Sequence, residues 1–398
     1  MNNKLWANDD LDSLDEAIEI FTVGKDYLLD YKLINYDIAA SRAHASGLCK
    51  IGVITTEELS LLNEQLDIIE TLVSQGEFHI SAKDEDCHTA IEKHLTRTCG
   101  DAGKKIHTGR SRNDQILVAT RLYMKSEIKT IEKLSLELIS ALENKISTHG
   151  QQKMPGYTHM QRAMPSSIGM WLGSFRDSFE DDRKLLSCVN EIIDQNPLGS
   201  VSGYGESCLG LDRQHTTSQL NFAKIQKNPM YCAMSRGKFE LMLLQAGQQM
   251  VFSLGKLATD LMLFTTKEFD YCTLPNNLTT GSSAMPQKRN YDVCELIRGK
   301  GSYYNGLVSS IANVIDKLPS GYNRDLQLTK QLLIEGCELL ESLIAAMTTV
   351  INNLDFNVEK MDSNCTSELY ATEEAYSLVK NNGLPFRDAY HKVAKKYK

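Results

Sequence analysis

"QLLIEGCELLESLIAAMTTVI", residues 331–351, decides the fold class of this chain. Its apolar side chains recur every three or four positions, which is the spacing of one face of an α-helix. Residues 134–147 repeat the pattern, and residues 250–264 are apolar on most faces, as in a helix inside a bundle. Only 8 prolines interrupt the chain, and alternating strand patterns are hardly found. The sequence therefore predicts an all-α fold. The stripe in the quoted stretch comprises Leu332, Leu333, Leu339, Leu340, Leu343 and Ile344.

Breaks between the helical segments predict three helical domains. Shorter helices and the polar stretch SQGEFHISAKDED fall in residues 1–104, and the long helices fall in residues 105–350, as a central bundle. Residues 351–398 form a small third domain with its own helix start at LPFRDAY.

Composition narrows the class of protein. The chain has 398 residues, of which 42% are hydrophobic and 24% charged, and its net charge is −8, which argues against a nucleic-acid partner. The acidic start MNNKLWANDDLD has no hydrophobic signal region, and no apolar run is long enough for a membrane span. None of the 10 cysteines forms a C-x-x-C pair. We expect a cytoplasmic protein that binds neither membrane nor nucleic acid.

The first polar stretch that needs an explanation is HTGRSRNDQ, residues 107–115. It places Ser111, Arg112 and Asn113 at the start of a helical run near Gln115. Helix N-termini bind anions, and arginine matches carboxylates with two parallel hydrogen bonds. A dicarboxylate site is one interpretation. The other is a helix cap at Asn113 or Asp114 with solvated arginines.

A second stretch, MPGYTHMQRAMPSS, covers residues 154–167. It places His159 between Thr158 and Gln161, at the expected start of a helix near Gln161. Histidine titrates near neutral pH and is the usual proton shuttle. The alternative is a histidine that only satisfies the hydrogen bonds of a loop.

The third stretch, TGSSAMPQKRN, covers residues 280–290 and has no regular period. The following helix is expected to bury Val293, Leu296, Ile297 and Tyr304, which leaves Glu295 free for a polar site. Lys288 and the helix N-terminus could stabilise a developing oxyanion. The alternative is an ordinary surface loop.

Two other stretches collect polar side chains. LPSGYNRDLQLTK (318–330) supplies Tyr322, Arg324, Gln327 and Lys330, either for a site or as the start of an amphipathic helix. DEDCH (84–88) could hold a metal, but no second ligand cluster follows, so we interpret it as a solvated acidic run. No phosphate-binding glycine motif is present.

These motifs together resemble a known family. GSSAMPQKRN resembles the signature loop of the fumarase/aspartase superfamily, and HTGRSRNDQ with GYTHMQRAMP resembles the argininosuccinate lyases within it. The resemblance runs from SRAHASGL (41–48) to GLPFRDAY (383–390). It implies an all-α homotetramer that merges long helices into one core. It also implies reversible cleavage of argininosuccinate to arginine and fumarate, without metal or organic cofactor.

The resemblance also implies a role for each matching residue. Ser282 would be the base that removes the Cβ proton, and His159, oriented by Glu295, would handle the proton of the leaving guanidino nitrogen. Lys288 and Asn290 would stabilise the aci-carboxylate intermediate. The residues implied to hold the substrate are Ser111, Arg112, Asn113, Thr158, Tyr322, Gln327 and Lys330.

The chain departs from the family pattern at three places. Tyr291 stands where members commonly have proline. Gly237 stands where many have an acidic residue, so the sequence assigns no substrate contact to the segment around Arg236. The chain also stops soon after PFRDAY, which predicts a shortened C-terminal domain.

Two rival functions share these features. Adenylosuccinate lyase has the same loop, but it handles a nucleotide phosphate and is not expected to contain RSRND. A structural protein like δ-crystallin can have the fold and the site residues without activity.

Helix length predicts that each active site is shared between chains. The helix that begins near Gln115 is expected to reach about Ser147, roughly 50 Å at 1.5 Å per residue. Asn113 and His159 would then lie at opposite ends of a helical hairpin. If both serve one reaction, they must come from different subunits.

Overall fold

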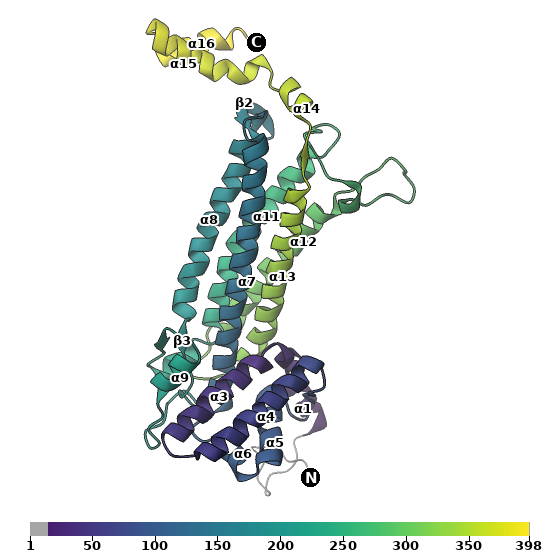
Figure 1. The fold of residues 1–398 in the computed structure, drawn as a ribbon. Helices are drawn as coiled ribbons and strands as arrows, with labels where there is room; N and C mark the ends of the chain where they lie inside the picture. The colour runs from purple at the N-terminus through teal and green to yellow at the C-terminus, as the bar shows by residue number, and fades with distance from the viewer. Residues whose placement is uncertain (1–14, 398) are drawn as a thin grey trace. The chain divides into compact units, whose positions relative to one another are not determined.

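The computed structural model describes residues 15–397, so the acidic start of the chain lies outside the described residues. Long helices dominate, and the predicted all-α fold is confirmed (Figure 1). The α-helices are α1 (Glu16–Val23), α2 (Asp26–Leu29), α3 (Ile34–Lys50), α4 (Thr56–Gln75), α5 (Cys87–Cys99), α6 (Asp101–Lys105), α7 (Arg112–His149), α8 (Ile168–Ile193), α9 (Arg213–Gln219), α10 (Pro229–Met234), α11 (Lys238–Phe264), α12 (Asp292–Ile315), α13 (Leu328–Asn352), α14 (Val358–Ser363), α15 (Ala371–Asn382) and α16 (Phe386–Ala394).

Short elements connect the helices. The 3₁₀ helices are η1 (Asp30–Lys32), η2 (Asn276–Leu278), η3 (Arg324–Gln327) and η4 (Ser367–Tyr370). The strands are β1 (Lys153–Thr158), β2 (Gln161–Ser167), β3 (Gln195–Asn196), β4 (Lys224–Ile225), β5 (Cys272–Thr273) and β6 (Asp355–Phe356). They form three two-stranded sheets: β1–β2 and β5–β6 are antiparallel, and β3–β4 is parallel.

The chain divides into two compact units. The first contains residues 1–130, 185–246 and 305–338, and the second contains residues 131–184, 247–304 and 339–398. The boundaries of the three helical domains expected from the sequence stay a prediction. No helix in residues 15–397 is long and apolar enough to cross a membrane.

In the first unit, α3, α4 and α5 pack around an apolar core that includes Ile38, Leu48, Leu66, Ile91 and Leu95. Local sequence sets where these helices begin. The side chain of Thr55 caps α4 by accepting from the N–H of Glu58, while the Glu58 carboxylate accepts from the N–H of Thr55. Such a reciprocal pair satisfies two N–H groups that the helix itself leaves without partners. This core supports one wall of the site described below.

In the second unit, α11 packs against its neighbours so closely that side-chain size matters. A Cβ atom on Gly247 would lie 2.4 Å from the Tyr304 hydroxyl on α12 and 2.6 Å from Leu340 on α13. Polar contacts join α8 to the same helix, since the Trp171 indole donates to Asp260 at 2.9 Å. Glycine at position 247 therefore permits the close approach of three helices.

Most expected helices are confirmed, with two corrections. Residues 331–351 lie within α13, and residues 134–147 lie within α7. However, no helix begins near Gln161, because residues 153–167 form the hairpin β1–β2 and α8 begins only at Ile168. Leu296 is 58% exposed instead of buried, because the buried stripe of α12 passes through Cys294, Ile297 and Tyr304.

Candidate active site

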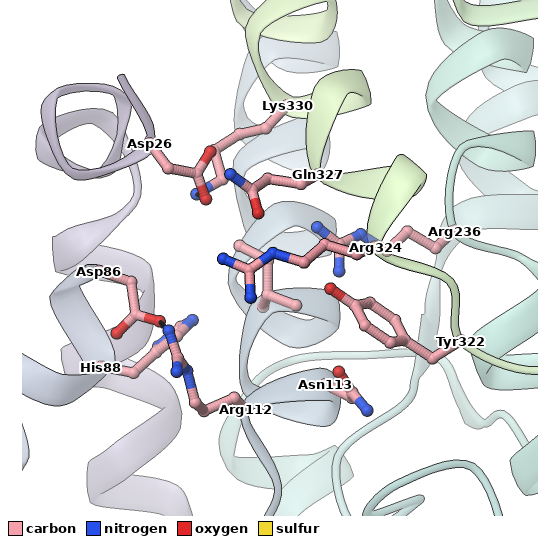
Figure 2. A pocket seen from close by; sticks show the side chains of 11 residues that line it. Asp26, Asp86, His88, Arg112, Asn113, Arg236, Tyr322, Arg324, Gln327 and Lys330 are labelled. Atoms are coloured by element: carbon pink, nitrogen blue, oxygen red, sulfur yellow. Dashed lines mark hydrogen bonds and ion pairs between the residues drawn. The ribbon is translucent and has the colours of Figure 1, made fainter. Parts of the chain in front are cut away.

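Five of the predicted substrate-binding residues line one cavity of about 180 Å³ in the first unit (Figure 2). They come from the start of α7 and from the segment that leads into α13, which are far apart in the sequence. The fold therefore gathers Arg112, Asn113, Tyr322, Gln327 and Lys330. The wall is completed by Asp26, Asp86, His88, Ile116, Arg236 and Arg324.

Arg112, the first residue of α7, is held by the acidic run that precedes α5. Its Nε donates to Asp86 Oδ2 at 2.8 Å and its Nη1 donates to Glu85 Oε2 at 3.1 Å. Burial opposes the ionisation of Asp86, but His88 and Arg112 outweigh it, so its pKa lies below the usual value. The interpretation of DEDCH as a solvated run is therefore wrong for Glu85, Asp86 and His88, which are buried against these partners.

The first turn of α7 is fixed by backbone-directed hydrogen bonds. The Ser111 hydroxyl accepts from the N–H of Asn113 at 3.3 Å, and the Ser111 N–H donates to Asp114 Oδ1 at 2.8 Å. Asp114 is fully buried and also accepts from Gly199 and Val201, and burial raises its pKa. Ser111 therefore caps α7, and Asp114 at the third helical position accepts from its N–H, which leaves Asn113 on the cavity wall. Ser111 is not among the lining residues, and its substrate contact stays a prediction.

Lys330 lies at the opposite wall between two aspartates. Its Nζ is 2.9 Å from Asp26 Oδ2 and 2.5 Å from Asp30 Oδ1. Burial disfavours the charged amine, but the two carboxylates outweigh it and raise the pKa of Lys330. At Asp26, burial dominates over the nearby amine and raises the pKa of the carboxyl. Lys330 is therefore a buried cation with its counter-charges already in place.

Arg236 lies on the same wall, in the segment that the sequence left unassigned. Its guanidinium carbon is 5.3 Å from the centre of the Tyr322 ring. The next residue, Gly237, has φ 76°, and a Cβ there would lie 2.4 Å from Ile315. The left-handed backbone and the close contact both favour glycine at this position.

The predicted catalytic loop lies in the second unit. Residues 280–290 form no helix or strand, as expected, and one isolated bridge joins Thr280 to Asn290 before α12 begins. Lys288, Asn290 and Glu295 line a cavity of about 540 Å³ there, together with Tyr291 and the cation of Lys267. The cations that line this cavity near the start of α12 can stabilise an anion in it.

Ser282 has a local environment that favours a charged oxygen. Its Oγ accepts from the N–H groups of Ala284 at 3.3 Å and Met285 at 3.1 Å. Hydrogen bonds to the charged form of a group stabilise that form. The loop therefore offers two donors to a serine alkoxide, although Ser282 does not line the cavity.

Thr158 and His159 occupy a hairpin turn rather than a helix start. Thr158 pairs with Gln161, and the two residues between them, His159 and Met160, have φ of 52° and 62°. Positive φ at both central positions is the pattern of a type I′ turn. His159 is exposed, and among residues 15–397 no hydrogen bond or ion pair links it to Glu295. Its orientation by Glu295 stays a prediction.

One group of potential metal ligands occurs among the described residues. Asp37, Cys87 and His88 are buried with their ligand atoms within 4.8 Å of one another. However, Asp37 Oδ2 is 2.8 Å from His88 Nδ1, and Arg110 lies 3.5 Å from the same carboxylate. Burial disfavours a charged ring, but Asp37 outweighs it and raises the pKa of His88. The cluster is therefore occupied by its own ion pairs, which compete with a metal ion.

Several lining residues were not assigned to the site from sequence. Arg324 was noted among the donors of residues 318–330 but was given no role. Asp86 and His88 belong to DEDCH, and the available signal was that an acidic stretch can pair with the arginines of residues 107–115. Asp26 had no local signal, since its segment shows only that a short helix begins.

Known proteins are similar to this chain in sequence and in fold. A family model described as a lyase matches residues 12–304. Argininosuccinate lyase of Thermotoga neapolitana is 43% identical over 100% of this chain and 99% of that protein. Argininosuccinate lyase of Xanthomonas campestris is 43% identical over 99% of this chain and 90% of that protein.

Two solved structures have a similar fold at low sequence identity. EDDS lyase in complex with formate superposes with TM-score 0.81 at 22% identity, over 96% of this chain and 75% of that chain. Class II fumarase from Schistosoma mansoni superposes with TM-score 0.79 at 17% identity, over 95% and 88%.

Proposed function

The chain belongs to the family of argininosuccinate lyases, and we propose that it catalyses the reversible cleavage of argininosuccinate into L-arginine and fumarate. It is a carbon–nitrogen lyase of arginine biosynthesis. The observation that carries the assignment is the convergence of Arg112, Asn113, Tyr322, Gln327 and Lys330 on one cavity, in a chain similar to these enzymes over its full length.

The difficult step is removal of a proton next to a carboxylate, because the resulting dianion is unstable in water. Fixed positive charge around the enolate-like oxygens supplies most of the stabilisation in such sites. We assign this task to Lys288 and Asn290, which share the cavity at the start of α12. The amine supplies charge where it develops, and the amide supplies a hydrogen bond.

Ser282 is the proposed base for the Cβ proton. The two N–H groups aimed at its Oγ support this role, since they favour the alkoxide over the neutral hydroxyl. His159 is the proposed acid that protonates the leaving guanidino nitrogen, with Glu295 as the group that orients it. Thr158, beside His159, and Ser111 contact the substrate in this proposal.

We propose that Asn113 and His159 in one site come from different subunits of a homotetramer. Helix α7 has 38 residues, which is about 57 Å at 1.5 Å per residue. Asn113 lies in its first turn, and His159 follows its last residue, His149. The chain from His149 to His159 spans at most about 36 Å, even when it is fully extended. The two groups of one chain therefore cannot contact one small substrate.

Complementation between inactive variants tests the shared site. Asn113→Ala and His159→Ala proteins are mixed, mildly dissociated and reassembled. Random mixing leaves about a quarter of the sites with both groups intact, by symmetry counting. Activity that stays at the level of the separate variants, although mixed oligomers form, would refute the shared site.

The proposed reaction is tested by following fumarate release through its ultraviolet absorbance. We expect release from argininosuccinate and none from adenylosuccinate. Release from adenylosuccinate instead would assign the chain to the other lyase. Release from neither, by a folded protein, would favour a structural role like that of δ-crystallin.

A cytoplasmic location is part of the proposal. All ten cysteines lie in residues 15–397, and no disulfide bond joins any of them there, as in proteins of a reducing compartment.

A further inference from the structure

The tip of the hairpin β1–β2, which carries His159, lies beyond a break in the pairing of its two strands. The register shifts just before Tyr157, and two pairs, Tyr157 with Arg162 and Thr158 with Gln161, lie beyond this β-bulge. A two-stranded hairpin is only marginally stable by itself. A turn whose central residues have positive φ also costs energy unless its surroundings hold it in place. The tip therefore needs contacts from outside the hairpin.

The side chain of Tyr157 supplies such a contact. Its hydroxyl group forms a hydrogen bond with the hydroxyl group of Tyr271, and the two oxygens lie 2.7 Å apart. The rings of Phe264 and Phe269 pack beside both tyrosines, with centres 6.2 Å and 5.5 Å from the Tyr157 ring and 5.5 Å and 5.7 Å from the Tyr271 ring. Aromatic rings at these separations attract one another. Tyr157 therefore joins the tip of the hairpin to an aromatic cluster at the end of α11.

Tyr271 is a fixed point for this hydrogen bond. It is fully buried, its N–H donates to the carbonyl oxygen of Phe264 at 2.8 Å, and its own carbonyl oxygen accepts from the N–H of Asn357 at 2.8 Å. Burial, together with the hydrogen bond to Tyr157, raises the pKa of Tyr271. The hydroxyl pair therefore keeps its protons, and its geometry, at neutral pH.

The second strand of the tip is also attached to the same unit. Arg162, the cross-strand partner of Tyr157, donates through Nη2 to Asn364 Oδ1 at 3.0 Å. Arg162 is exposed, so water competes for this hydrogen bond, whereas the bond of Tyr157 is partly buried. A hydrogen bond is electrostatically stronger where water is excluded. Tyr157 is therefore the stronger of the two attachments.

We propose that Tyr157 is a positioning residue, which holds the turn through its hydrogen bond to Tyr271 so that His159 reaches the leaving nitrogen. This inference rests on the proposed function for the role of His159. A general acid must come within hydrogen-bonding distance of the atom that it protonates. Tyr157 acts on the rate through His159 and does not itself touch the reacting atoms.

Removal of single hydroxyl groups from the full chain tests the proposal. Tyr157→Phe keeps the ring in the aromatic cluster and removes the hydrogen bond. We expect kcat to fall about 10- to 100-fold, since a displacement of about 1 Å in an active site can cost this much. KM should change by less than about twofold, because the substrate contacts are retained. Tyr271→Phe removes the same bond, so it should have the same effect, and the two changes together should cost no more than either alone.

Two further measurements distinguish positioning from a general contribution to the fold. In a His159→Asn background, Tyr157→Phe should alter the remaining kcat by less than about twofold, because the group that it positions is absent. A tyrosine that only stabilises the fold would lower kcat by the same factor with or without the histidine. Hydrogen exchange followed by mass spectrometry should show faster exchange of residues 157–162 in Tyr157→Phe.

Tyr397→Phe is the matched control. Its hydroxyl group donates to Glu374 Oε2 at 3.2 Å, outside the hairpin, so the same chemical change removes a hydrogen bond elsewhere. This variant should keep the kcat of the parent protein and its exchange in residues 157–162. Circular dichroism verifies that each variant is folded.

Kinetics and exchange separate this inference from the proposed function. A parent protein that releases no fumarate, or a His159→Asn variant as fast as the parent, would refute the proposed reaction or the proposed acid and this inference with it. If both of these hold, the inference alone is overturned by a Tyr157→Phe variant with the kcat of the parent, by unchanged exchange at the tip, or by an equal loss of kcat in the His159→Asn background.

Discussion

Replacing Lys330 by methionine is expected to lower both the free energy of unfolding and kcat/KM, and the two effects can be measured separately. Lys330 is 3% exposed, and its Nζ contacts Asp26 and Asp30, of which Asp30 is fully buried. Methionine fills a similar volume but leaves Asp30 with the N–H of Cys87 as its hydrogen-bond donor in residues 15–397. Removing one partner of a buried ion pair costs about 3–5 kcal/mol because the other charge stays desolvated. We expect a loss of this size in the free energy of unfolding.

The double variant Lys330→Met with Asp30→Asn removes both charges. It should recover most of the lost stability, to within about 1–2 kcal/mol of the parent protein. Catalysis should stay impaired, because the predicted substrate contact of Lys330 is still absent. The matched control is Lys32→Met, whose partner Glu338 lies at 2.6 Å with both side chains at least half exposed. An exposed pair contributes about 0–1 kcal/mol.

Urea unfolding followed by circular dichroism measures these changes. Protein concentration is held constant, because the stability of an oligomer depends on it. Equal losses in Lys330→Met and Lys32→Met, or a double variant no more stable than Lys330→Met, would refute the reasoning about the buried pair. A double variant that regains full kcat/KM would show that Lys330 supports the fold but does not bind substrate.

Three further outcomes can be checked with the same protein. Ser282→Ala should lower kcat by about 10²-fold or more with little change in the dissociation constant of the substrate, since a base acts only as the proton leaves; retention of more than about a few per cent of activity would exclude it as the base. Lys288→Met should cost at least as much in kcat as His159→Asn, and steady-state rates near the parent value would place the lysine outside the site. Burial, aided by Arg110, lowers the pKa of His44 from 6.5 to about 3. Below pH 6.5 the unfolded chain therefore binds a proton that the folded chain does not bind, so the free energy of unfolding decreases as the pH is lowered. His44→Gln should therefore reduce the slope of unfolding free energy against pH by about 1.4 kcal/mol per unit between pH 6 and 4, and an unchanged slope in urea titrations would contradict this.

The helices could be predicted from sequence because their signal is local. The stripe in residues 331–351 needs only neighbours three and four positions apart, and α13 forms there (Figure 1). The loop at residues 280–290 was equally visible, since its small and polar residues have no period and α12 begins directly after it. The motif residues Arg112, Asn113 and Lys288 could likewise be chosen from local chemistry.

The hairpin that carries His159 could not be predicted in this way. Its turn has positive φ at His159 and Met160, yet methionine does not favour this conformation, and no Asn-Gly signal marks the turn. The five residue pairs between β1 and β2 hold the turn, and pairing is a relation between two segments. The local sequence of either strand alone therefore predicted a helix start near Gln161 where the hairpin β1–β2 forms.

The charge state and composition of the cavity were decided only by the tertiary structure. From the sequence alone, DEDCH was interpreted as a solvated run. In the folded chain, Arg112 from another helix pairs with the buried Asp86 and balances its charge. Asp26 and Lys330 lie at opposite ends of the sequence, and their contact exists only because α2 packs beside the start of α13. Sequence supplies the ionisable groups, but burial and the distance to a counter-charge set their electrostatic energy, and both are properties of the folded chain.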